Sequence, residues 1–167
     1  MTVTIEQIIF WASAGVLAYV YVGYPLLIWL LGALAPKRVN AGNVEPHVTV
    51  LITAFNEAAS IRRKIENTLK LDYPPAKLEI LVASDGSTDG TDEIVGEFAS
   101  AGLKLFRQEG RVGKTVTQNN AVSRATGEIV LFSDATTIYR EDALKLVMPA
   151  FADENIGCVA GRLVYVD

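Results

Sequence analysis

The sequence contains a single cysteine, and this scarcity limits the covalent structure of the chain. Cys158 stands alone among 167 residues, so a disulfide within the chain is excluded. Its neighbours Ile156, Val159 and Ala160 are apolar, which predicts a buried thiol on a strand with only a packing role. The sequence also has no internal repeat and no low-complexity tract.

Charged side chains are absent from residue 8 to residue 34. About 20 apolar residues are enough for a helix to cross the hydrocarbon core of a bilayer, which is roughly 30 Å thick. The stretch therefore predicts a membrane-spanning helix, with Pro25 as the expected position of a kink. A cleaved signal peptide is disfavoured because Glu6 precedes the run and no Ala-x-Ala site follows it. A buried core helix, the other alternative, rarely runs so long without charge.

Charged residues return directly after the apolar stretch, at Lys37 and Arg38. Because positive charge favours the cytoplasmic flank of a membrane helix, these residues predict that the following chain lies in the cytoplasm. We expect a single span in the inner (plasma) membrane. Three parts are predicted: a transmembrane helix over 1–36, a polar linker over 37–46, and a soluble domain over 47–167.

The soluble part alternates strand-like and helix-like segments. Predicted strands are 48–54, 78–84, 103–106 and 128–133, with one or two more in 156–166; predicted helices are 57–71, 89–99 with Asp89 as its cap, 113–125 and 141–151. This alternation predicts an α/β fold, with a mostly parallel sheet and helices on both faces. In such sheets ligands bind beyond the carboxyl ends of the strands.

Polar residues follow three of the predicted strands. They are residues 53–57 (TAFNE), residues 84–91 (SDGSTDGT) and residues 133–137 (SDATT). Carboxylates that converge at one sheet edge repel one another unless a cation or hydrogen-bond donors lie between them. The pattern indicates a metal-assisted site for a polyol or a nucleotide. Taken singly, Asp85, Asp89 and Asp134 are equally compatible with structural roles in turns and caps.

Two common nucleotide-binding motifs are missing. No Gly-x-Gly-x-x-Gly follows the first strand, which argues against a dinucleotide-dependent oxidoreductase. The run RVGKT at 111–115 invites a P-loop interpretation, but the first glycine of that motif would fall at Gln108. Lys114 at a helix start is still suited to an anion, because its ammonium and the helix N-terminus both favour negative charge. Alternatively, Lys114 is a solvated surface lysine.

Four motifs resemble those of family 2 glycosyltransferases, in the same order along the chain. They are TAFNE at 53–57, SDGSTDGT at 84–91, RVGK at 111–114 with Asn119, and FSDA at 132–135. The resemblance covers roughly residues 47–167. It implies the GT-A fold, a Rossmann-like sheet that holds a nucleoside diphosphate sugar. With its N-terminal helix, the chain is similar to poly-N-acetylglucosamine synthases and related membrane polysaccharide synthases. This similarity implies a UDP-sugar donor, a glycan or lipid-linked acceptor, contact with membrane lipid and no nucleic-acid partner.

The resemblance also assigns residues. It implies nucleotide-sugar binding by Thr53, Ala54, Phe55, Glu57, Asp85, Lys114, Ser133, Asp134 and Ala135. Asp134 stands where the metal-binding Asp-x-Asp motif begins, which implies a divalent cofactor, Mg²⁺ or Mn²⁺. The second aspartate of that motif is replaced by Thr136, and a hydroxyl is a weaker ligand than a carboxylate for a hard cation.

In the family, the general base that activates the acceptor lies well after the metal motif, commonly in a Thr-Glu-Asp-like sequence. No such motif occurs before Asp167, and Asp142 and Asp153 are too close to the metal motif to take that role. We therefore expect the chain to be the donor-binding half of an inverting, hexosyltransferase-like enzyme, with no catalytic base of its own. The alternative is a membrane-anchored nucleotide-binding or assembly subunit without catalysis.

Overall fold

The computed structural model of the protein describes residues 4–34 and 39–164. The chain divides into two compact units, Met1–Val39 and Asn40–Asp167. The first unit contains a helix over Ile5–Leu34 with a mean hydropathy of 1.8 and no buried residue in its apolar window. Its length and composition are sufficient to cross a membrane, as the absence of charge predicted. Lys37 and Arg38 lie outside the described residues, so the orientation of the span stays a prediction.

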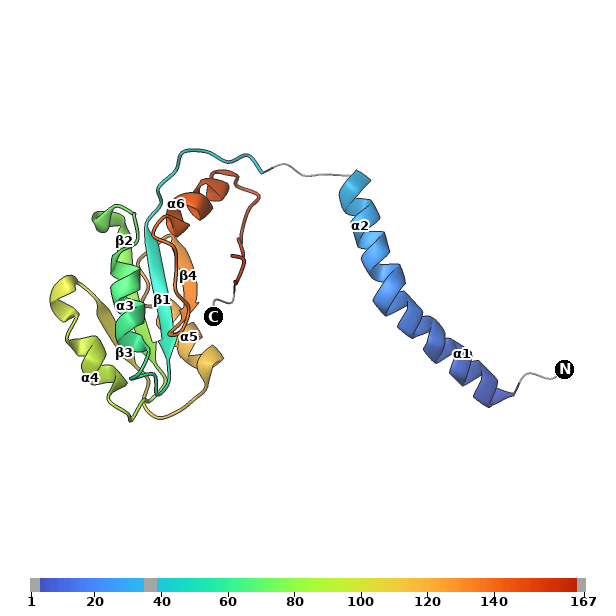
Figure 1. Ribbon diagram of the computed structural model, residues 1–167, viewed down its shortest axis with the longest axis horizontal. Coiled ribbons are helices and arrows are strands. Elements are labelled where there is room, and N and C mark those ends of the chain that lie inside the picture. Colours follow the sequence, from blue (N-terminus) through green and yellow to red (C-terminus); the bar gives the residue numbers. More distant parts are fainter. Residues whose placement is uncertain (1–3, 35–38, 165–167) are drawn as a thin grey trace. The chain divides into compact units, whose positions relative to one another are not determined.

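The long helix changes its hydrogen bonding immediately before Pro25. It consists of α1 (Ile5–Ala18), a π-helical turn (Tyr19–Gly23) and α2 (Tyr24–Leu34), and the ribbon stays helical throughout (Figure 1). The Tyr24 amide donates to the carbonyl of Tyr19. A proline ring lacks a donor and crowds the carbonyl four residues earlier, and a single wider turn relieves that crowding. The structure thus has a π turn directly before the segment that contains Pro25, whereas the kink expected at Pro25 stays a prediction.

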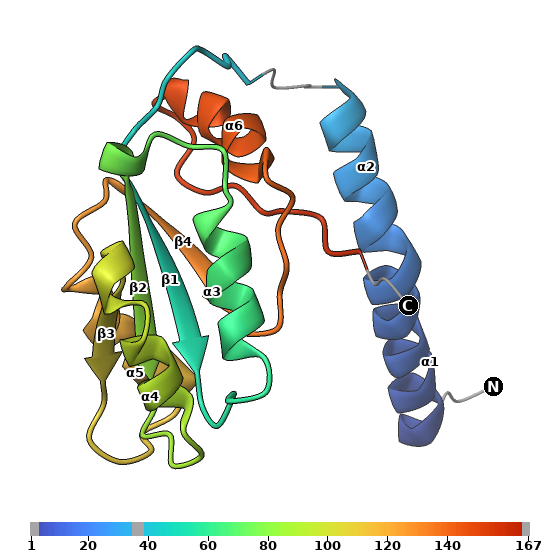
Figure 2. The same cartoon turned by 60° about the vertical axis from the view of Figure 1, so that its left-hand side comes forward.

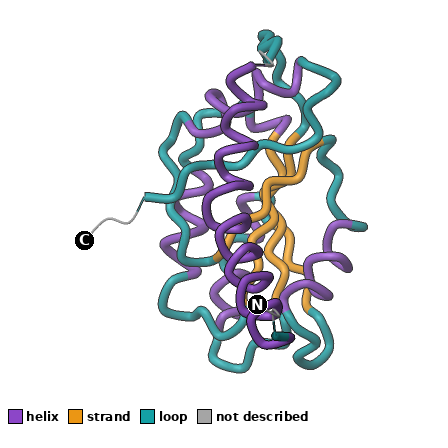
Figure 3. The backbone as a smooth tube through the Cα atoms, turned by 90° about the vertical axis from the view of Figure 1, so that its right-hand side faces the viewer, coloured by secondary structure: helices purple, strands orange, loops and turns teal. Residues whose placement is uncertain are grey.

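The second unit is built on four parallel strands, β1 (Val48–Ala54), β2 (Leu78–Ser84), β3 (Lys104–Arg107) and β4 (Ile129–Asp134). Their order across the sheet is β3-β2-β1-β4, and Figure 3 shows them side by side. The chain moves outward from β1 to β3 and then returns to the other side of β1. The point between β1 and β4 is therefore the topological switch point, where open α/β sheets form a ligand crevice.

Helices cover both faces of this sheet (Figure 2). On one face, apolar side chains of β1 pack against α3 (Ile61–Leu69), α4 (Thr91–Gly96) and α6 (Ala143–Val147). On the other face, Leu51 and Leu81 pack with Ala121 of α5 (Lys114–Val122). Alternate β1 residues from Val48 to Ala54 belong to the first core, Leu51 belongs to the second, and all of β1 is buried. The predicted α/β class, with a mostly parallel sheet and helices on both faces, is confirmed.

Several predicted boundaries differ from the structure. Residues 57–60 form a turn, so α3 begins at Ile61. Gly90, with a φ of 94°, occupies the N-cap position of α4 that was predicted for Asp89. The helix predicted over 141–151 is divided into α6 and a 3₁₀ segment (Met148–Ala152), because Pro149 has no amide hydrogen to continue the α-helical pattern. Two further 3₁₀ turns, Pro75–Lys77 and Ala99–Ala101, were not predicted.

The prediction of strands over 156–166 is wrong for the part that the structure describes. Residues 156–164 contain no strand, and Cys158 is exposed instead of buried. In the four-stranded sheet β4 is bonded to β1 alone. A strand exists only with a neighbour that satisfies its amides and carbonyls, so an apolar, β-branched composition did not suffice to define one here.

At the amino-terminal edge of the sheet, the Glu79 carboxylate joins three strands. It accepts hydrogen bonds from Thr49 Oγ1 of β1 at 2.5 Å, Lys104 Nζ of β3 at 2.7 Å and the Thr126 amide before β4 at 2.8 Å. Burial alone would raise the pKa of Glu79. The hydrogen bonds from Lys104, Thr126 and Thr49 outweigh burial and lower this pKa from 4.5 to about 2.

We expect Glu79→Gln to destabilise the sheet and to remove part of its acid sensitivity. Because the pKa of Glu79 is lower in the folded state, the stabilisation is full above pH 4.5 and is lost as the pH falls towards about 2. A shift of this size corresponds to roughly 3 kcal/mol at neutral pH. Hydrogen exchange of β1 and β2 amides measures it, with the exposed Glu66→Gln as the control. Equal pH dependence in wild type and Glu79→Gln would contradict the assignment.

Candidate functional site

A cleft of about 270 Å³ opens at the carboxyl ends of β1, β2 and β4. It is lined by Thr53, Ala54, Phe55, Glu57, Asp85, Lys114, Asp134, Ala135 and Thr136. Except for Ser133, every residue that the sequence predicted for the site is therefore brought together, and Thr136 joins them. Ser133 is buried, and its hydroxyl donates to the Asp134 carbonyl at 3.2 Å. Asn119, quoted with the third motif, is exposed on α5 and does not line the cleft.

The register of the parallel strands explains this convergence. Thr53 is paired with Asp134 across β1 and β4, and Ala54 is paired with Ser84 across β1 and β2. The strands therefore end at the same level, and the residues that follow them share one edge of the sheet. This edge includes the switch point between β1 and β4, which is the expected position of a ligand crevice.

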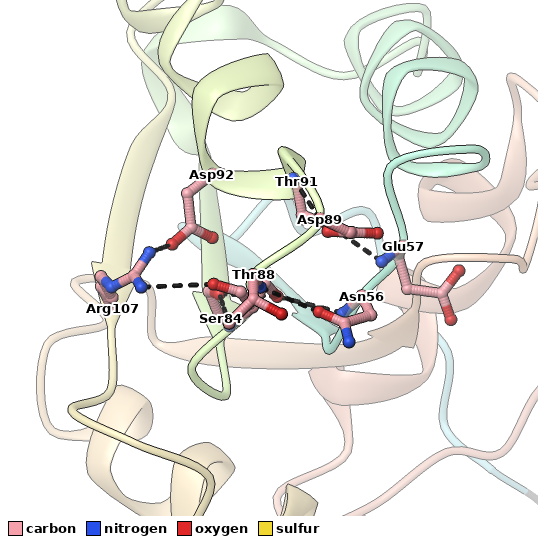
Figure 4. A network of polar contacts seen from close by, with 9 residues as sticks. Asn56, Glu57, Ser84, Thr88, Asp89, Thr91, Asp92 and Arg107 are labelled. Carbon is pink, nitrogen blue, oxygen red and sulfur yellow. Dashed lines mark hydrogen bonds and ion pairs between the residues drawn. The ribbon is translucent and has the colours of Figure 1, made fainter.

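The loop after β2 holds the loop after β1 by three hydrogen bonds to backbone amides, and Figure 4 shows Thr91 and Asp89 beside Glu57 in this network. Ser87 Oγ accepts from the Asn56 amide at 3.1 Å, and Thr91 Oγ1 accepts from the Glu57 amide at 2.8 Å. Asp89 Oδ2 accepts from the Ala58 amide at 2.9 Å. The hydroxyls and the second carboxylate of the SDGSTDGT run thus fix the backbone that carries Phe55 and Glu57.

Asn56 is the turning point of the loop after β1. Its φ of 54° is in the left-handed region, which asparagine tolerates better than most residues. Its Oδ1 accepts from the Thr88 amide at 2.9 Å, so the two loops are bonded in both directions. Arg107 of β3 supports the loop after β2 as well. It pairs with Asp92 of α4 and donates to the Ser87 carbonyl at 3.2 Å.

Asp85 connects β2 to the start of α5. Its carboxylate is buried and accepts from the amides of Val112 and Gly113, at 2.9 Å and 3.0 Å, and from Thr117 Oγ1 at 2.8 Å. Burial alone would raise the pKa of Asp85, but these hydrogen bonds and the nearby Arg111 charge outweigh it and hold the pKa below the usual value. Asp85 is therefore an anion that organises the loop leading to Lys114.

The loop after β2 and the loop before α5 approach each other too closely for any side chain at Gly86. A Cβ placed there would lie 2.6 Å from the Gly110 carbonyl oxygen, and the φ of Gly86 is 71°. Both conditions require glycine.

Lys114 and Asp134 form an ion pair at the rim of the cleft. Lys114 Nζ lies 2.5 Å from Asp134 Oδ1, and both side chains are slightly more than half exposed, at 57% and 55%. Lys114 is the first residue of α5, whose N-cap position is taken by Gly113 with a φ of 96°. The pair thus combines an ammonium, a helix N-terminus and a carboxylate in one accessible place, which suits a ligand with a phosphate and a cation.

Sequence reasoning missed two contacts at this site. Gln118 Nε2 donates to Thr53 Oγ1 at 3.0 Å, and the Arg111 guanidinium lies 4.2 Å from the centroid of the Phe55 ring. The position of Gln118 was predictable, because it is four residues after Lys114 and so lies on the same face of the helix. The Arg111–Phe55 contact joins two loops, and no local pattern indicates it.

The oxygen atoms at this end of the cleft are compatible with a hard divalent cation that also binds a diphosphate. Within residues 4–34 and 39–164, no three His, Cys, Asp or Glu side chains are grouped to hold a metal by themselves. The Asp134 carboxylate and the Thr136 residue nevertheless line the same cleft, and both carry oxygen ligands of the kind that Mg²⁺ and Mn²⁺ prefer. Magnesium commonly takes one or two protein carboxylates and completes its shell with phosphate and water.

Residues 49–167 match the family model described as glycosyl transferase family 2. A beta-monoglucosyldiacylglycerol synthase from Nostoc sp. is 34% identical over 121 residues, covering 70% of this chain and 26% of the relative. A poly-beta-1,6-N-acetyl-D-glucosamine synthase from Staphylococcus aureus is 32% identical over 127 residues, covering 74% and 30%. The chain therefore spans less than a third of the length of these two relatives.

Solved structures agree with this match. A mannosyltransferase from Pyrobaculum calidifontis, in complex with GDP-Man and Mn²⁺, is similar with a TM-score of 0.73 and 34% identity, covering 87% of this chain and 45% of that one. S. aureus TarS 1-349, in complex with UDP-GlcNAc, is similar with a TM-score of 0.60 and 29% identity, covering 71% and 37%.

We expect Asp89→Ala to loosen the loop after β1 without unfolding the sheet. The substitution removes the acceptor of the Ala58 amide and the partner of the Thr91 amide and hydroxyl. Hydrogen exchange at Glu57 and Ala58 should become faster, while exchange within β1 stays slow. Thr88→Ala is the matched control, because only the backbone amide of Thr88 takes part in the network. Unchanged protection of the Ala58 amide in Asp89→Ala would refute this role.

Proposed function

The chain belongs to glycosyl transferase family 2, and from this premise we propose that it binds a nucleoside diphosphate sugar in the cleft and contributes the donor side of an inverting glycosyl transfer. One observation carries the proposal. Asp85, Lys114 and Asp134, from three separate stretches of the chain, meet around one cleft at the switch point of the sheet. In this cleft the ammonium suits the diphosphate of such a donor, the aromatic ring suits its base, and the accessible carboxylate suits a cation bound with the diphosphate.

We assign the base and the ribose to the end of β1. Thr53, Phe55 and Glu57 line this part of the cleft, and hydrogen bonds from the loop after β2 hold the backbone at Asn56 and Glu57. Lys114 and the N-terminus of α5 are assigned to the diphosphate, where the ammonium offsets the charge that grows on the leaving group during transfer. Asp134, with Thr136 beside it, is assigned to a divalent cation. When bound, the cation supplies further charge neutralisation at the diphosphate.

The nucleobase and the acceptor are narrower proposals. We propose a UDP-sugar, supported by the TarS complex with UDP-GlcNAc, with a GDP-sugar as the alternative supported by the mannosyltransferase complex. For the acceptor we propose a glycan or a lipid-linked molecule. The name of the poly-N-acetylglucosamine synthase supports a glycan, and the name of the glucosyldiacylglycerol synthase supports a lipid acceptor.

We propose that the general base comes from outside this donor-binding part. Among the described residues, the carboxylates that line the cleft are Glu57, Asp85 and Asp134, and their partners are Ser60, the loop before α5, and Lys114. Asp142 is paired with Arg140 at 2.7 Å and does not line the cleft. The alternative of a nucleotide-binding subunit without catalysis is supported by Thr136 at the second position of the metal motif.

We expect manganese to strengthen UDP binding, and Asp134→Asn to lower the affinity for UDP with Mn²⁺ by at least about tenfold, because the amide is a neutral and weaker ligand. Isothermal titration of the full-length protein in detergent, with UDP and GDP, each in Mn²⁺ and in EDTA, measures this. Asp142→Asn is the matched control, since Asp142 is paired outside the cleft.

A variant with a second carboxylate tests the proposed cation site in the opposite direction. Thr136→Asp restores a second carboxylate at the rim and should raise the affinity for Mn²⁺ itself. Wild-type protein that binds neither UDP nor GDP would overturn the proposed function. Equal Mn²⁺-dependent affinity in wild type and Asp134→Asn would overturn the assignment of the cation to Asp134.

We also propose that α1 and α2 anchor the protein in the inner membrane, with the α/β unit in the cytoplasm. The support is the apolar helix Ile5–Leu34 and the positive charges at Lys37 and Arg38. The single, exposed Cys158 provides a label. A membrane-impermeant maleimide should react with Cys158 in inverted membrane vesicles and not in intact spheroplasts, with Cys158→Ser as the blank. Labelling in intact spheroplasts would reverse the proposed orientation.

A further inference from the structure

The ammonium of Lys64 is buried beneath the loop that follows β4. Lys64 is on α3 and is completely buried, which is rare for lysine unless its charge has partners. Its Nζ donates to the Thr137 carbonyl at 2.6 Å and lies 3.8 Å from the centroid of the Tyr139 ring. These contacts attach α3 to a segment 73 residues later in the sequence.

Asn67, one turn further along α3, binds the same loop by two hydrogen bonds. Its Nδ2 donates to the Tyr139 carbonyl at 2.8 Å, and its Oδ1 accepts from the Tyr139 amide at 2.8 Å. The side-chain amide therefore satisfies both backbone groups of one residue, as a neighbouring strand would. Together Lys64 and Asn67 fix the backbone of residues 137–139 with three hydrogen bonds.

The fixed backbone continues directly into the rim of the cleft. The Thr137 amide donates to the Asp134 carbonyl at 3.2 Å, which closes a turn over residues 134–137. Asp134, Ala135 and Thr136 line the cleft, whereas the backbone of residues 137–139 is bonded to α3. A displacement of that backbone would therefore move the side chains of Asp134 and Thr136.

The charge of Lys64 is costly at this place. Burial lowers the pKa of Lys64 from 10.5 to about 8, although the Asp134 carboxylate acts in the opposite direction. An apolar side chain of similar volume would avoid this cost, so packing alone does not account for a lysine. The polar contacts to the loop do account for it.

We propose that Lys64 and Asn67 are positioning residues that hold the loop after β4 so that Asp134 and Thr136 face the cation and diphosphate of the donor. This inference rests on the proposed function. It separates the cleft into parts with different supports: the cation side depends on α3, whereas the base and ribose side depends on the loop after β2. Substitutions at Lys64 and Asn67 should therefore affect nucleotide binding only where the cation contributes.

The test compares Lys64→Met and Asn67→Ala with the exposed Glu66→Ala on the same helix. Titration of the full-length protein in detergent with UDP in Mn²⁺ should show an affinity about tenfold lower in the first two variants, as is typical when residues that orient metal ligands are removed. UDP in EDTA should bind with unchanged affinity in all three. GDP replaces UDP if the wild type prefers it.

A double-mutant cycle distinguishes positioning from a general structural role. Combined with Asp134→Asn, Asn67→Ala should cost little further affinity for UDP with Mn²⁺, because both act through the same carboxylate. Asn67 is only partly buried, so this variant decides the question if Lys64→Met does not fold. Additive effects, an equal loss in EDTA, or no loss in Mn²⁺ would each overturn the inference. Wild-type protein that binds neither nucleotide would overturn the proposed function and the inference with it.

Discussion

The buried carboxylate of Asp85 is the interaction on which the shape of the cleft depends. A charge with little access to water is stable only when donors surround it, and here the donors come from the loop before α5 and from Thr117 within α5. The end of β2 is thereby tied to the start of α5, and Lys114 is placed as a consequence. Both oxygens of Asp85 already accept hydrogen bonds from the chain, so turning either toward a ligand would loosen the loop that carries Lys114.

The other two loops that line the cleft are also fixed by polar contacts, on the side that faces away from the cleft. The loop after β2 bonds the amides of Asn56 and Glu57, and α3 bonds the loop after β4 through Lys64 and Asn67. Loops cannot bury enough apolar surface to fix themselves, and they leave backbone groups that need partners. Side-chain hydrogen bonds fix the loops and satisfy these backbone groups, and they leave the side of each loop that lines the cleft exposed. A polar ligand requires a rim of this kind, because its binding groups must be accessible and already oriented.

Much of the fold and the site could be predicted, because both depend on where strands end. The bounds of β1 and β2 followed from apolar runs that stop at polar residues, and the parallel order places those ends together. Prediction failed where a feature depends on distant partners. Residues 156–164 resemble a strand and have no neighbour in the four-stranded sheet, so Cys158 is exposed. The contacts of Lys64 and Asn67 cross more than 70 positions, and no local pattern reveals them.

The ion pair between Lys114 and Asp134 bears on how the rim uses a cation. With Thr136 in place of a second carboxylate, Asp134 is the acidic member of residues 134–136, and Lys114 forms an ion pair with it. Two carboxylates at this place would repel and would require a cation even before a donor arrives. A single carboxylate paired with a lysine has no such requirement. Under the proposed function, the diphosphate draws the ammonium toward itself and leaves Asp134 available to a metal ion. Under that function, binding of the donor and binding of the cation would be coupled through one side chain, Lys114.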